Sequence, residues 1–201
     1  MQSVFYYGVM KASKSAQLIL KASTYQKQGI EPIIIKPTTD TRDGGGIVHS
    51  RIGIEMPATY TIEPDDIDKV IEIGTLARQQ NRPIFVDEAQ FFEPSVLKCL
   101  LSTTTVWNNN EDLSHVNVYL YGLLKDFSNE LFDGTKAIIE NVDKMSEIKT
   151  QCEEPSCGRK ATCNFLSHRD VLSGAKFIVG DKNYHVYCQT HYIKHMKEGR
   201  C

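Results

Sequence analysis

The sequence predicts an α/β protein with a parallel β-sheet, followed by a small cysteine-rich unit. Apolar runs alternate with helical patterns through the first 150 residues. A glycine-containing turn joins the first apolar run to the first helical pattern, and five of the six cysteines lie after residue 150. Alternating strands and helices are typical of parallel sheets with right-handed crossover connections.

The first strand, helix and second strand are predicted over residues 4–7, 15–28 and 32–36. The helix carries apolar side chains three and four positions apart, and Gly29 follows it as a suitable C-terminal cap. The β-branched run at 32–36 favours a strand. Because the connections are short, these three elements are expected to form a parallel βαβ unit.

The remaining elements of the first 150 residues follow from turn residues and apolar spacing. Acidic residues after Pro64 suit the first turn of a helix. The sequence predicts, in order, a loop at 40–46, a hairpin within 47–61, a helix from 64–66 onward, a strand at 83–87, a helix at 95–101, a long polar connection at 102–115, a strand at 116–122, a helix at 136–142 and a strand at 145–150.

Residues 8–15 match a phosphate-binding loop except at one position. The strict pattern is Gly, four residues, Gly, Lys and then Ser or Thr, and Ser13 stands at the second glycine. A turn that enters a helix N-terminus presents backbone N–H groups and partial positive charge to a phosphate. Lys14 is expected to reach the outer phosphates, and Ser15 to bind a magnesium ion. The other interpretation is a glycine-containing turn before an ordinary amphipathic helix.

A pair of carboxylates ends the strand predicted at 83–87. Functional groups of α/β sheets gather beyond the carboxyl ends of the strands, where the loop at 8–15 is also expected. Asp87 stands where phosphate-loop enzymes hold magnesium, and Glu88 then points elsewhere and is suited to act as a base. Alone, the pair would indicate only a strand followed by a solvated loop. Together with a phosphate loop, it predicts phosphoryl transfer.

Two closely spaced ligand pairs in the last third of the chain predict a structural zinc site. The pairs have internal spacings typical of tetrahedral zinc, and thiolates with imidazole suit zinc better than magnesium. The candidate ligands are Cys152, Cys157, Cys188 and His191. Cys163 is an alternative ligand without a close partner, and His185 and His195 compete with His191 without sharing its spacing from Cys188.

Composition places a boundary near Thr150. Residues 1–150 are expected to form the nucleotide-binding domain and residues 151–201 the zinc-binding domain. Short β-like runs at 161–166, 176–179 and 184–187 and a basic helix at 189–197 are predicted in the second domain.

Charge and hydropathy limit the partners of the 201-residue chain. Its net charge is −2, whereas a broad nucleic-acid surface favours a basic balance. No apolar run approaches the roughly 20 residues of a membrane span, and the N-terminus has no secretory pattern. We therefore expect a cytoplasmic protein that binds neither nucleic acid nor membranes.

Taken together, these motifs resemble those of the zinc-containing cytosolic thymidine kinases, and most of all their bacterial and phage branch. The resemblance extends from about residue 5 to residue 191. It rests on the cysteine pattern and on residues 8–15, 40–42, 48–53, 85–92 and 121–127.

The resemblance implies a P-loop (RecA-like) parallel-sheet domain and a small β-rich zinc domain that carries a lasso loop. It implies transfer of the γ-phosphate of ATP to the 5′-hydroxyl of thymidine or deoxyuridine, with Glu88 as the catalytic base and Mg²⁺ at Ser15 and Asp87. The residues implied to bind ATP are Gly8, Val9, Met10, Lys11, Ala12, Ser13, Lys14, Ser15, Asp87, Glu88, Ala89 and Gln90.

The resemblance also implies how the nucleoside and the zinc are held. The lasso at 174–185 is expected to close over the base, with Tyr184 packed on the thymine. Met10, Leu123 and Phe127 match pocket walls. Cys152, Cys157, Cys188 and His191 match the zinc ligands, Asp40 and Arg42 match a polar pair that faces the phosphates, and a homotetramer is expected.

Three departures from the family pattern leave alternatives open. They are Ser13 in the phosphate loop, the pair Leu124 and Lys125, and an insertion at 107–112. Ser13 raises the alternative of a catalytically decayed nucleotide-binding relative. The basic stretch at 194–200 raises that of a zinc module that binds nucleic acid beside an ATPase domain.

Overall fold

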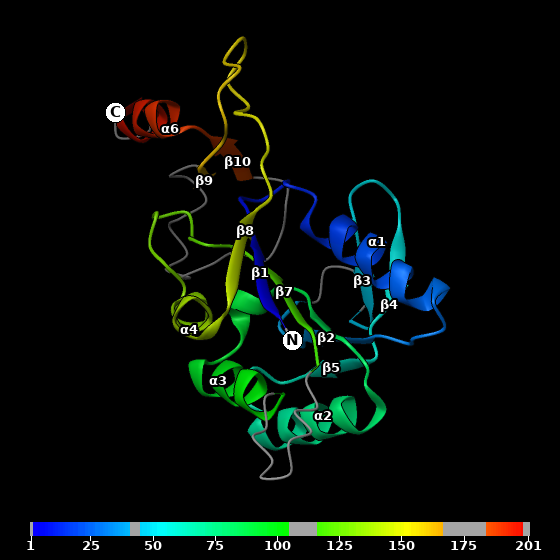
Figure 1. Ribbon diagram of the computed structural model, residues 1–201. Helices are drawn as coiled ribbons and strands as arrows, with labels where there is room; N and C mark the ends of the chain where they lie inside the picture. The colour runs from blue at the N-terminus through cyan, green and yellow to red at the C-terminus, as the bar shows by residue number, and fades with distance from the viewer. Residues whose placement is uncertain (1, 41–44, 105–115, 167–183, 199–201) are drawn as a thin grey trace.

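The computed structural model describes residues 2–40, 45–104, 116–166 and 184–198 of the chain. Its centre is a six-stranded sheet in the order β5-β2-β6-β7-β1-β8, and every neighbouring pair of strands is parallel (Figure 1). The predicted α/β class is therefore confirmed. The strands are β1 Ser3–Tyr7, β2 Ile33–Pro37, β5 Tyr60–Ile62, β6 Ile84–Val86, β7 Val118–Gly122 and β8 Lys144–Glu147.

Helices cover both faces of this sheet (Figure 1). Helix α1 (Lys14–Lys27) and the hairpin of β3 (Ile47–His49) and β4 (Glu55–Pro57) pack on one face. The other face is covered by α2 Ile67–Gln80, α3 Pro94–Thr103 and α4 Asp133–Asn141.

Strand β2 shows why the strands are continuously apolar. Ile33 and Ile35 pack into the core with α2–α4, whereas Ile34 packs into the core with α1. Successive side chains of a strand point to opposite faces, so a strand covered on both faces must be apolar throughout. The exception is Lys36, which is buried and forms a 3.2 Å ion pair with Asp40.

Most predicted elements are confirmed with small shifts of their ends. The predicted hairpin is confirmed as β3 and β4, but β5 leaves it and pairs in parallel with β2. Helix α3 extends to Thr103, so the predicted connection at 102–115 began too early, and residues 105–115 lie outside the described part of the chain. A short 3₁₀ helix, η1 (Ala89–Phe91), follows β6 and was not predicted.

The cysteine-containing part of the chain lies beyond the carboxyl end of β1 and β8 (Figure 1). Strands β9 (Cys163–Leu166) and β10 (Tyr184–Tyr187) are antiparallel, and helix α6 (Gln189–Glu198) contacts both. We call residues 151–166 and 184–198 the C-terminal unit; it has its own small core, which includes Tyr187 and Tyr192. The predicted strand at 176–179 and most of the predicted lasso lie outside the described residues.

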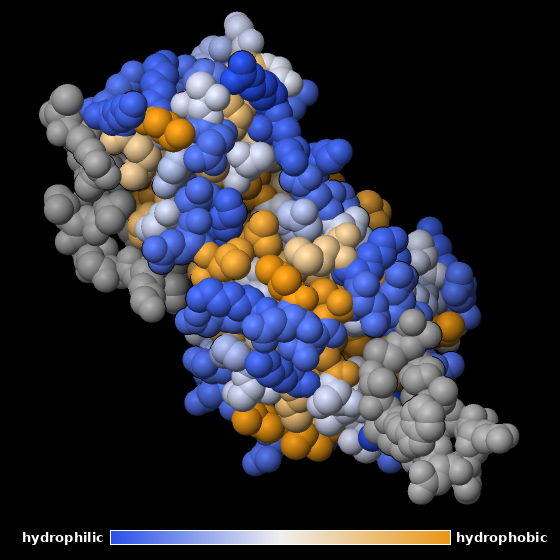
Figure 2. All heavy atoms as spheres, turned by 60° about the vertical axis from the view of Figure 1, so that its left-hand side comes forward, coloured by the Kyte–Doolittle hydropathy of each residue, from blue (hydrophilic) through white to orange (hydrophobic). Residues whose placement is uncertain are grey.

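The face that carries α4 and β8 shows hydrophobic residues gathered near its middle, with hydrophilic residues around them (Figure 2). Leu131, Ile139 and Met145 are among the exposed large hydrophobic residues of the described chain.

Of the described helices, none is both long enough and apolar enough to cross a membrane.

Candidate active site and metal cluster

A cavity of about 330 Å³ lies at the carboxyl ends of the sheet strands, within the size range of small-molecule sites. The loop between β1 and α1 forms one side of it, and Asp87 and Glu88 line it from the end of β6. Leu123 and Phe127, which follow β7, form another wall. Residues far apart in the sequence thus meet where a parallel sheet is expected to place its functional groups.

The phosphate loop begins with a glycine that no other residue can replace without a clash. A Cβ at Gly8 would lie 2.6 Å from the Ile148 carbonyl oxygen and 3.0 Å from the Ala12 Cβ. The first is a backbone contact and has little freedom to move. The glycine of the loop pattern is therefore required here for close packing against the chain that leaves β8.

Ser13 adopts the backbone conformation that a glycine would favour. Its φ and ψ are 60° and 31°, in the left-handed region, and Lys11 has a φ of 62°. A residue with a Cβ pays about 1 kcal/mol or more for such a conformation. Ser13 therefore introduces backbone strain, while the loop keeps its turn.

Lys14 and the start of α1 make this end of the cavity positive. Lys14 is buried, lines the cavity, and donates from Nζ to the Val9 carbonyl oxygen at 3.1 Å. The unpaired N–H groups of a helix N-terminus add partial positive charge at the same place. The arrangement suits an anion such as a phosphate.

Ser15 and Asp87, both predicted to bind magnesium, lie in contact. The Ser15 hydroxyl donates to the Asp87 carboxylate at 3.1 Å and 3.3 Å from its two oxygens. Asp87 is 4% exposed and Ser15 lines the same cavity. A hydroxyl and a carboxylate offer the oxygen ligands that Mg²⁺ prefers, so the donor set fits this ion.

Glu88 is held by Gln90 from beneath. Glu88 has a φ of 48°, lines the cavity and accepts a 2.6 Å hydrogen bond from Gln90 Nε2. Gln90 Oε1 in turn accepts from the Leu123 N–H at 2.9 Å. Gln90 is 3% exposed, and Ala89 belongs to the hydrophobic core. Four of the described residues that the resemblance implied to bind ATP do not line the cavity: Gly8, Val9, Ala89 and Gln90.

The four residues predicted to surround the base all line the cavity. They are Met10, Leu123, Phe127 and Tyr184. Sequence reasoning missed Phe91 and Phe132, whose rings meet edge to face with centroids 6.0 Å apart. Phe91 lies inside the motif at 85–92, so the sequence could have identified it as a cavity residue. Phe132 lies in none of the motifs. Asp40 lines the cavity and Arg42 lies outside the described residues.

The four predicted zinc ligands form a compact cluster. The ligand atoms of Cys152, Cys157, Cys188 and His191 all lie within 4.8 Å of one another. His191 Nδ1 is 3.5 Å from Cys152 Sγ and 3.4 Å from Cys188 Sγ, and the Cys157 and Cys188 sulfurs are 4.0 Å apart. Tetrahedral zinc with a Zn–S distance of about 2.3 Å places two sulfurs about 3.8 Å apart, so the cluster fits this ion.

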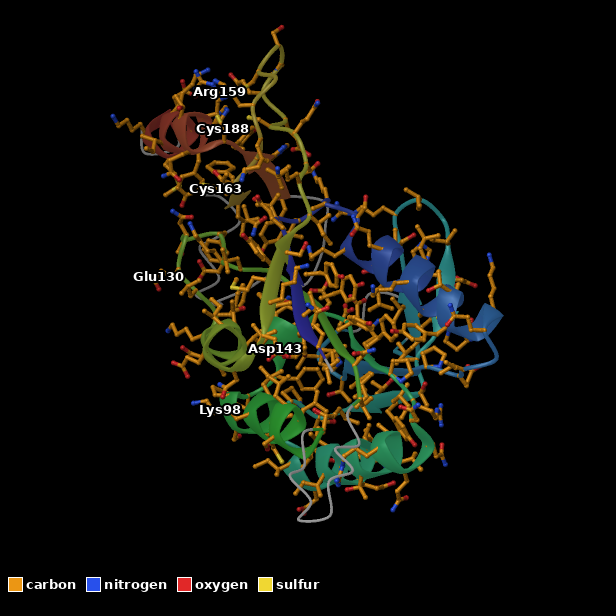
Figure 3. The ribbon with its side chains drawn as sticks, viewed as in Figure 1. Lys98, Glu130, Asp143, Arg159, Cys163 and Cys188 are labelled. Carbon is orange, nitrogen blue, oxygen red and sulfur yellow. The ribbon has the colours of Figure 1, made fainter. Side chains whose placement is uncertain are left out.

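Cys163 belongs to the same unit but is not part of the cluster. Cys163 and Cys188 both lie in the C-terminal unit, near α6 (Figure 3). The Cys163 thiol donates to Gln189 Oε1 at 3.1 Å, and burial raises its pKa. The metal-ligand cluster does not include Cys163, which lies outside the group of four ligand atoms. The geometry therefore agrees with the predicted set that contains His191, and not with Cys163 as the alternative ligand.

Comparison with known proteins gives one consistent answer. A family model described as thymidine kinase matches residues 1–192. The thymidine kinase of enterobacteria phage T4 is 35% identical over 194 residues, which cover 94% of each chain. Those of Vibrio parahaemolyticus and Streptococcus gordonii are 36% and 34% identical and cover 95% and 96% of this chain and 96% of each relative. The chain therefore belongs to the thymidine kinase family.

Proposed function

We propose that the chain transfers the γ-phosphate of ATP to the 5′-hydroxyl of thymidine or deoxyuridine, with Glu88 as general base. The observation that carries this proposal is the meeting of Ser15, Asp87 and Glu88 in one cavity at the N-terminus of α1. Phosphoryl transfer needs positive charge around the phosphates and a positioned nucleophile, and this cavity offers groups for both.

The phosphates of ATP are assigned to the loop. Of the loop at 8–15, residues 10–15 line the cavity. Backbone N–H groups of this stretch other than that of Met10, together with the Lys14 ammonium, would hold the phosphate oxygens, and Ser15 and Asp87 would hold Mg²⁺. When bound, Mg²⁺ neutralises part of the charge on the phosphate oxygens. Asp40 lies on the same cavity, where its buried partner Lys36 offsets its charge.

Glu88 is assigned to the proton of the nucleoside. The 5′-oxygen forms a bond to the γ-phosphorus, its proton passes to the Glu88 carboxylate, and the bond to the β–γ bridging oxygen breaks to release ADP. Gln90 fixes one Glu88 oxygen by its 2.6 Å hydrogen bond, and the Leu123 N–H fixes Gln90. We therefore assign Gln90 to orienting the Glu88 carboxylate. Ala89 packs in the hydrophobic core next to Glu88.

The base of the nucleoside is assigned to the apolar end of the cavity. Met10, Leu123, Phe127 and Tyr184 offer apolar and aromatic walls, which suit a flat pyrimidine. A lasso at 174–185 would complete this pocket.

The C-terminal unit is assigned a structural role. We propose a domain boundary near residue 150, with a kinase domain at 1–150 and a zinc domain at 151–201, because the C-terminal unit has its own core and its own two-stranded sheet. With four protein ligands, the zinc site would be closed and structural. A homotetramer in the cytoplasm is proposed on the family resemblance.

The decayed alternative is not favoured. Its motivation was Ser13, yet Lys14, Ser15, Asp87 and Glu88 all line the cavity and the loop keeps its left-handed turn. The slightly acidic net charge of −2 also disfavours the nucleic-acid alternative.

The test is thymidine-dependent release of ADP in a coupled assay with ATP and magnesium. We expect turnover with thymidine and background rates with deoxycytidine or without nucleoside. Glu88→Gln should lower kcat by about 100-fold or more, because general-base catalysis contributes about 10²–10⁴-fold. Glu93→Gln is the matched control, since the Glu93 side chain makes no capping hydrogen bond to α3. Normal turnover in Glu88→Gln would refute the mechanism.

A further inference from the structure

A buried asparagine of the C-terminal unit connects the two sides of the cavity. Asn164 lies on β9 and is 4% exposed. Its Oδ1 accepts from the Met10 N–H at 2.8 Å, and its Nδ2 donates to the Lys125 carbonyl oxygen at 2.9 Å. Met10 belongs to the phosphate loop, and Lys125 to the segment after β7. Only one orientation of the amide satisfies both partners, because one is a donor and the other an acceptor.

The loop that Asn164 contacts is strained. Lys11 and Ser13 both have left-handed backbone angles without being glycine. Strained residues persist only where the surroundings over-determine their conformation. The backbone hydrogen bonds that the loop makes at Gly8 and Ala12 are both 3.4 Å long. The Asn164 contact at 2.8 Å is shorter, and its partner Met10 directly precedes the first strained residue.

A second contact from the C-terminal unit reaches the same stretch of loop. Lys11 Nζ lies 2.7 Å from Glu153 Oε1. Both side chains are about one-third exposed, and such an ion pair contributes about 0–1 kcal/mol. The buried amide of Asn164 is the stronger restraint, because removal of a partner from a buried N–H leaves a desolvated donor unpaired.

We propose that Asn164 is a positioning residue that holds the strained phosphate loop in its nucleotide-binding conformation. The C-terminal unit would then set the affinity for the phosphate donor as well as cover the nucleoside. This inference rests on the proposed function, since it takes the loop to bind the phosphates of ATP.

Two substitutions separate the two hydrogen bonds. Asn164→Ala removes both of them and leaves the Met10 N–H without its acceptor. Asn164→Asp keeps an acceptor for Met10 and places a carboxylate oxygen against the Lys125 carbonyl. Tyr192→Phe is the matched control. It removes another buried hydrogen bond between the C-terminal unit and the segment after β7, from the Tyr192 hydroxyl to the Phe127 carbonyl at 2.9 Å, without touching the loop.

A third substitution tests the strain itself. Ser13→Gly removes the penalty of the left-handed conformation, because glycine has no Cβ. If Asn164 acts by holding a strained loop, its loss should matter less once the strain is gone. A purely structural role in the C-terminal unit would not respond to a change in the loop.

The experiment is calorimetric titration of the full chain with MgADP, after the zinc content of each variant has been confirmed. We expect Asn164→Ala to weaken MgADP binding about tenfold in the Ser13 background and by about twofold or less in the Ser13→Gly background. Asn164→Asp should fall between wild type and Asn164→Ala, and Tyr192→Phe should bind MgADP as wild type does.

The outcomes separate this inference from the proposed function. Equal losses of affinity in the two Ser13 backgrounds, or wild-type binding by Asn164→Ala, would overturn the inference. Failure of the wild type to bind MgADP would overturn both. Wild-type binding of MgADP without thymidine-dependent turnover would overturn the proposed function alone, and the double-mutant cycle would still decide the role of Asn164.

Discussion

The Ser15 hydroxyl lies 3.1 Å from one Asp87 carboxylate oxygen although 72 residues separate the two in sequence. Ser15 is in the first turn of α1, and Asp87 directly follows β6. The strand β7 lies between β1 and β6 in the sheet, so this contact spans these three neighbouring strands at their carboxyl ends. It defines the place where the proposed magnesium ion would be held.

The Ser15 and Asp87 pair predicts a magnesium-dependent defect. Asp87→Asn should lower kcat by about 100-fold, because the site loses a charge that helps to hold the metal at the phosphates. Ser15→Ala should raise the magnesium concentration needed for half-maximal rate. Ser15→Thr is the control, since the loop pattern accepts either hydroxyl. A magnesium titration of the steady-state rate checks this, and identical titrations in all variants would contradict it.

The close packing of Gly8 against Ile148 predicts that a larger residue at position 8 destabilises the protein. Gly8→Ala places a Cβ 2.6 Å from the Ile148 carbonyl oxygen, so the loop or the chain after β8 must move. We expect a loss of about 1–3 kcal/mol in the free energy of unfolding, which is typical of overpacking, together with weaker ATP binding. Gly46→Ala is the control, because no atom lies within 4 Å of its added Cβ. Chemical denaturation of both variants gives the comparison.

The cysteine cluster predicts selective loss of zinc. Cys188→Ala should abolish stoichiometric zinc binding, because Cys188 lies within ligand distance of both Cys157 and His191. Cys163→Ala should retain the metal, since the Cys163 sulfur is bonded to Gln189 outside the cluster. Zinc released by a thiol-reactive reagent and measured with a chromogenic chelator checks both. Zinc loss in Cys163→Ala alone would identify a different ligand set.

Asp143 predicts a pH dependence of stability. It follows α4 and lies beside the start of β1 (Figure 3). Its carboxylate accepts from the Ser3 N–H and hydroxyl, both at 2.7 Å, and these bonds lower its pKa below the usual range. Because the folded pKa is depressed, the stabilisation is complete above the unfolded pKa of about 3.9 and is lost as the pH falls through the folded value.

Asp143→Asn should therefore be less stable than wild type at pH 7, by about 1 kcal/mol, since the residue is exposed and its bonds are partly screened. The difference between the two proteins should shrink below about pH 3. Urea unfolding at a series of pH values measures it. A constant difference down to pH 2 would show that the Ser3 contact does not depend on the charge of Asp143.

The sequence predicted the site residues whose chemical type and spacing both indicate the same function. Asp87 was expected at the edge that carries the phosphate loop, because the carboxyl ends of parallel strands share one edge. The cysteine cluster followed from short spacings. Ser13 was correctly identified as the unusual residue of the loop, but only the structure shows that it takes the left-handed conformation itself.

Other features depend on long-range packing that no local pattern encodes. Strand β5 is three residues long and follows a hairpin, so its parallel pairing with β2 had no signal. Asn164 looks like any polar residue of a short strand until β9 is placed against Met10. The hydrogen bond from Gln90 to Glu88 likewise depends on the unpredicted turn η1 and on the Leu123 N–H.

The absence of room beside Gly8 has a consequence for how the protein can change over generations. The residue that limits this room, Ile148, donates its N–H to the Tyr7 carbonyl at 2.7 Å, and the chain then passes directly into the C-terminal unit. We expect an insertion or deletion between 148 and 151 to disturb the carbonyl that faces Gly8. The length of this junction is therefore expected to be constrained by the phosphate loop.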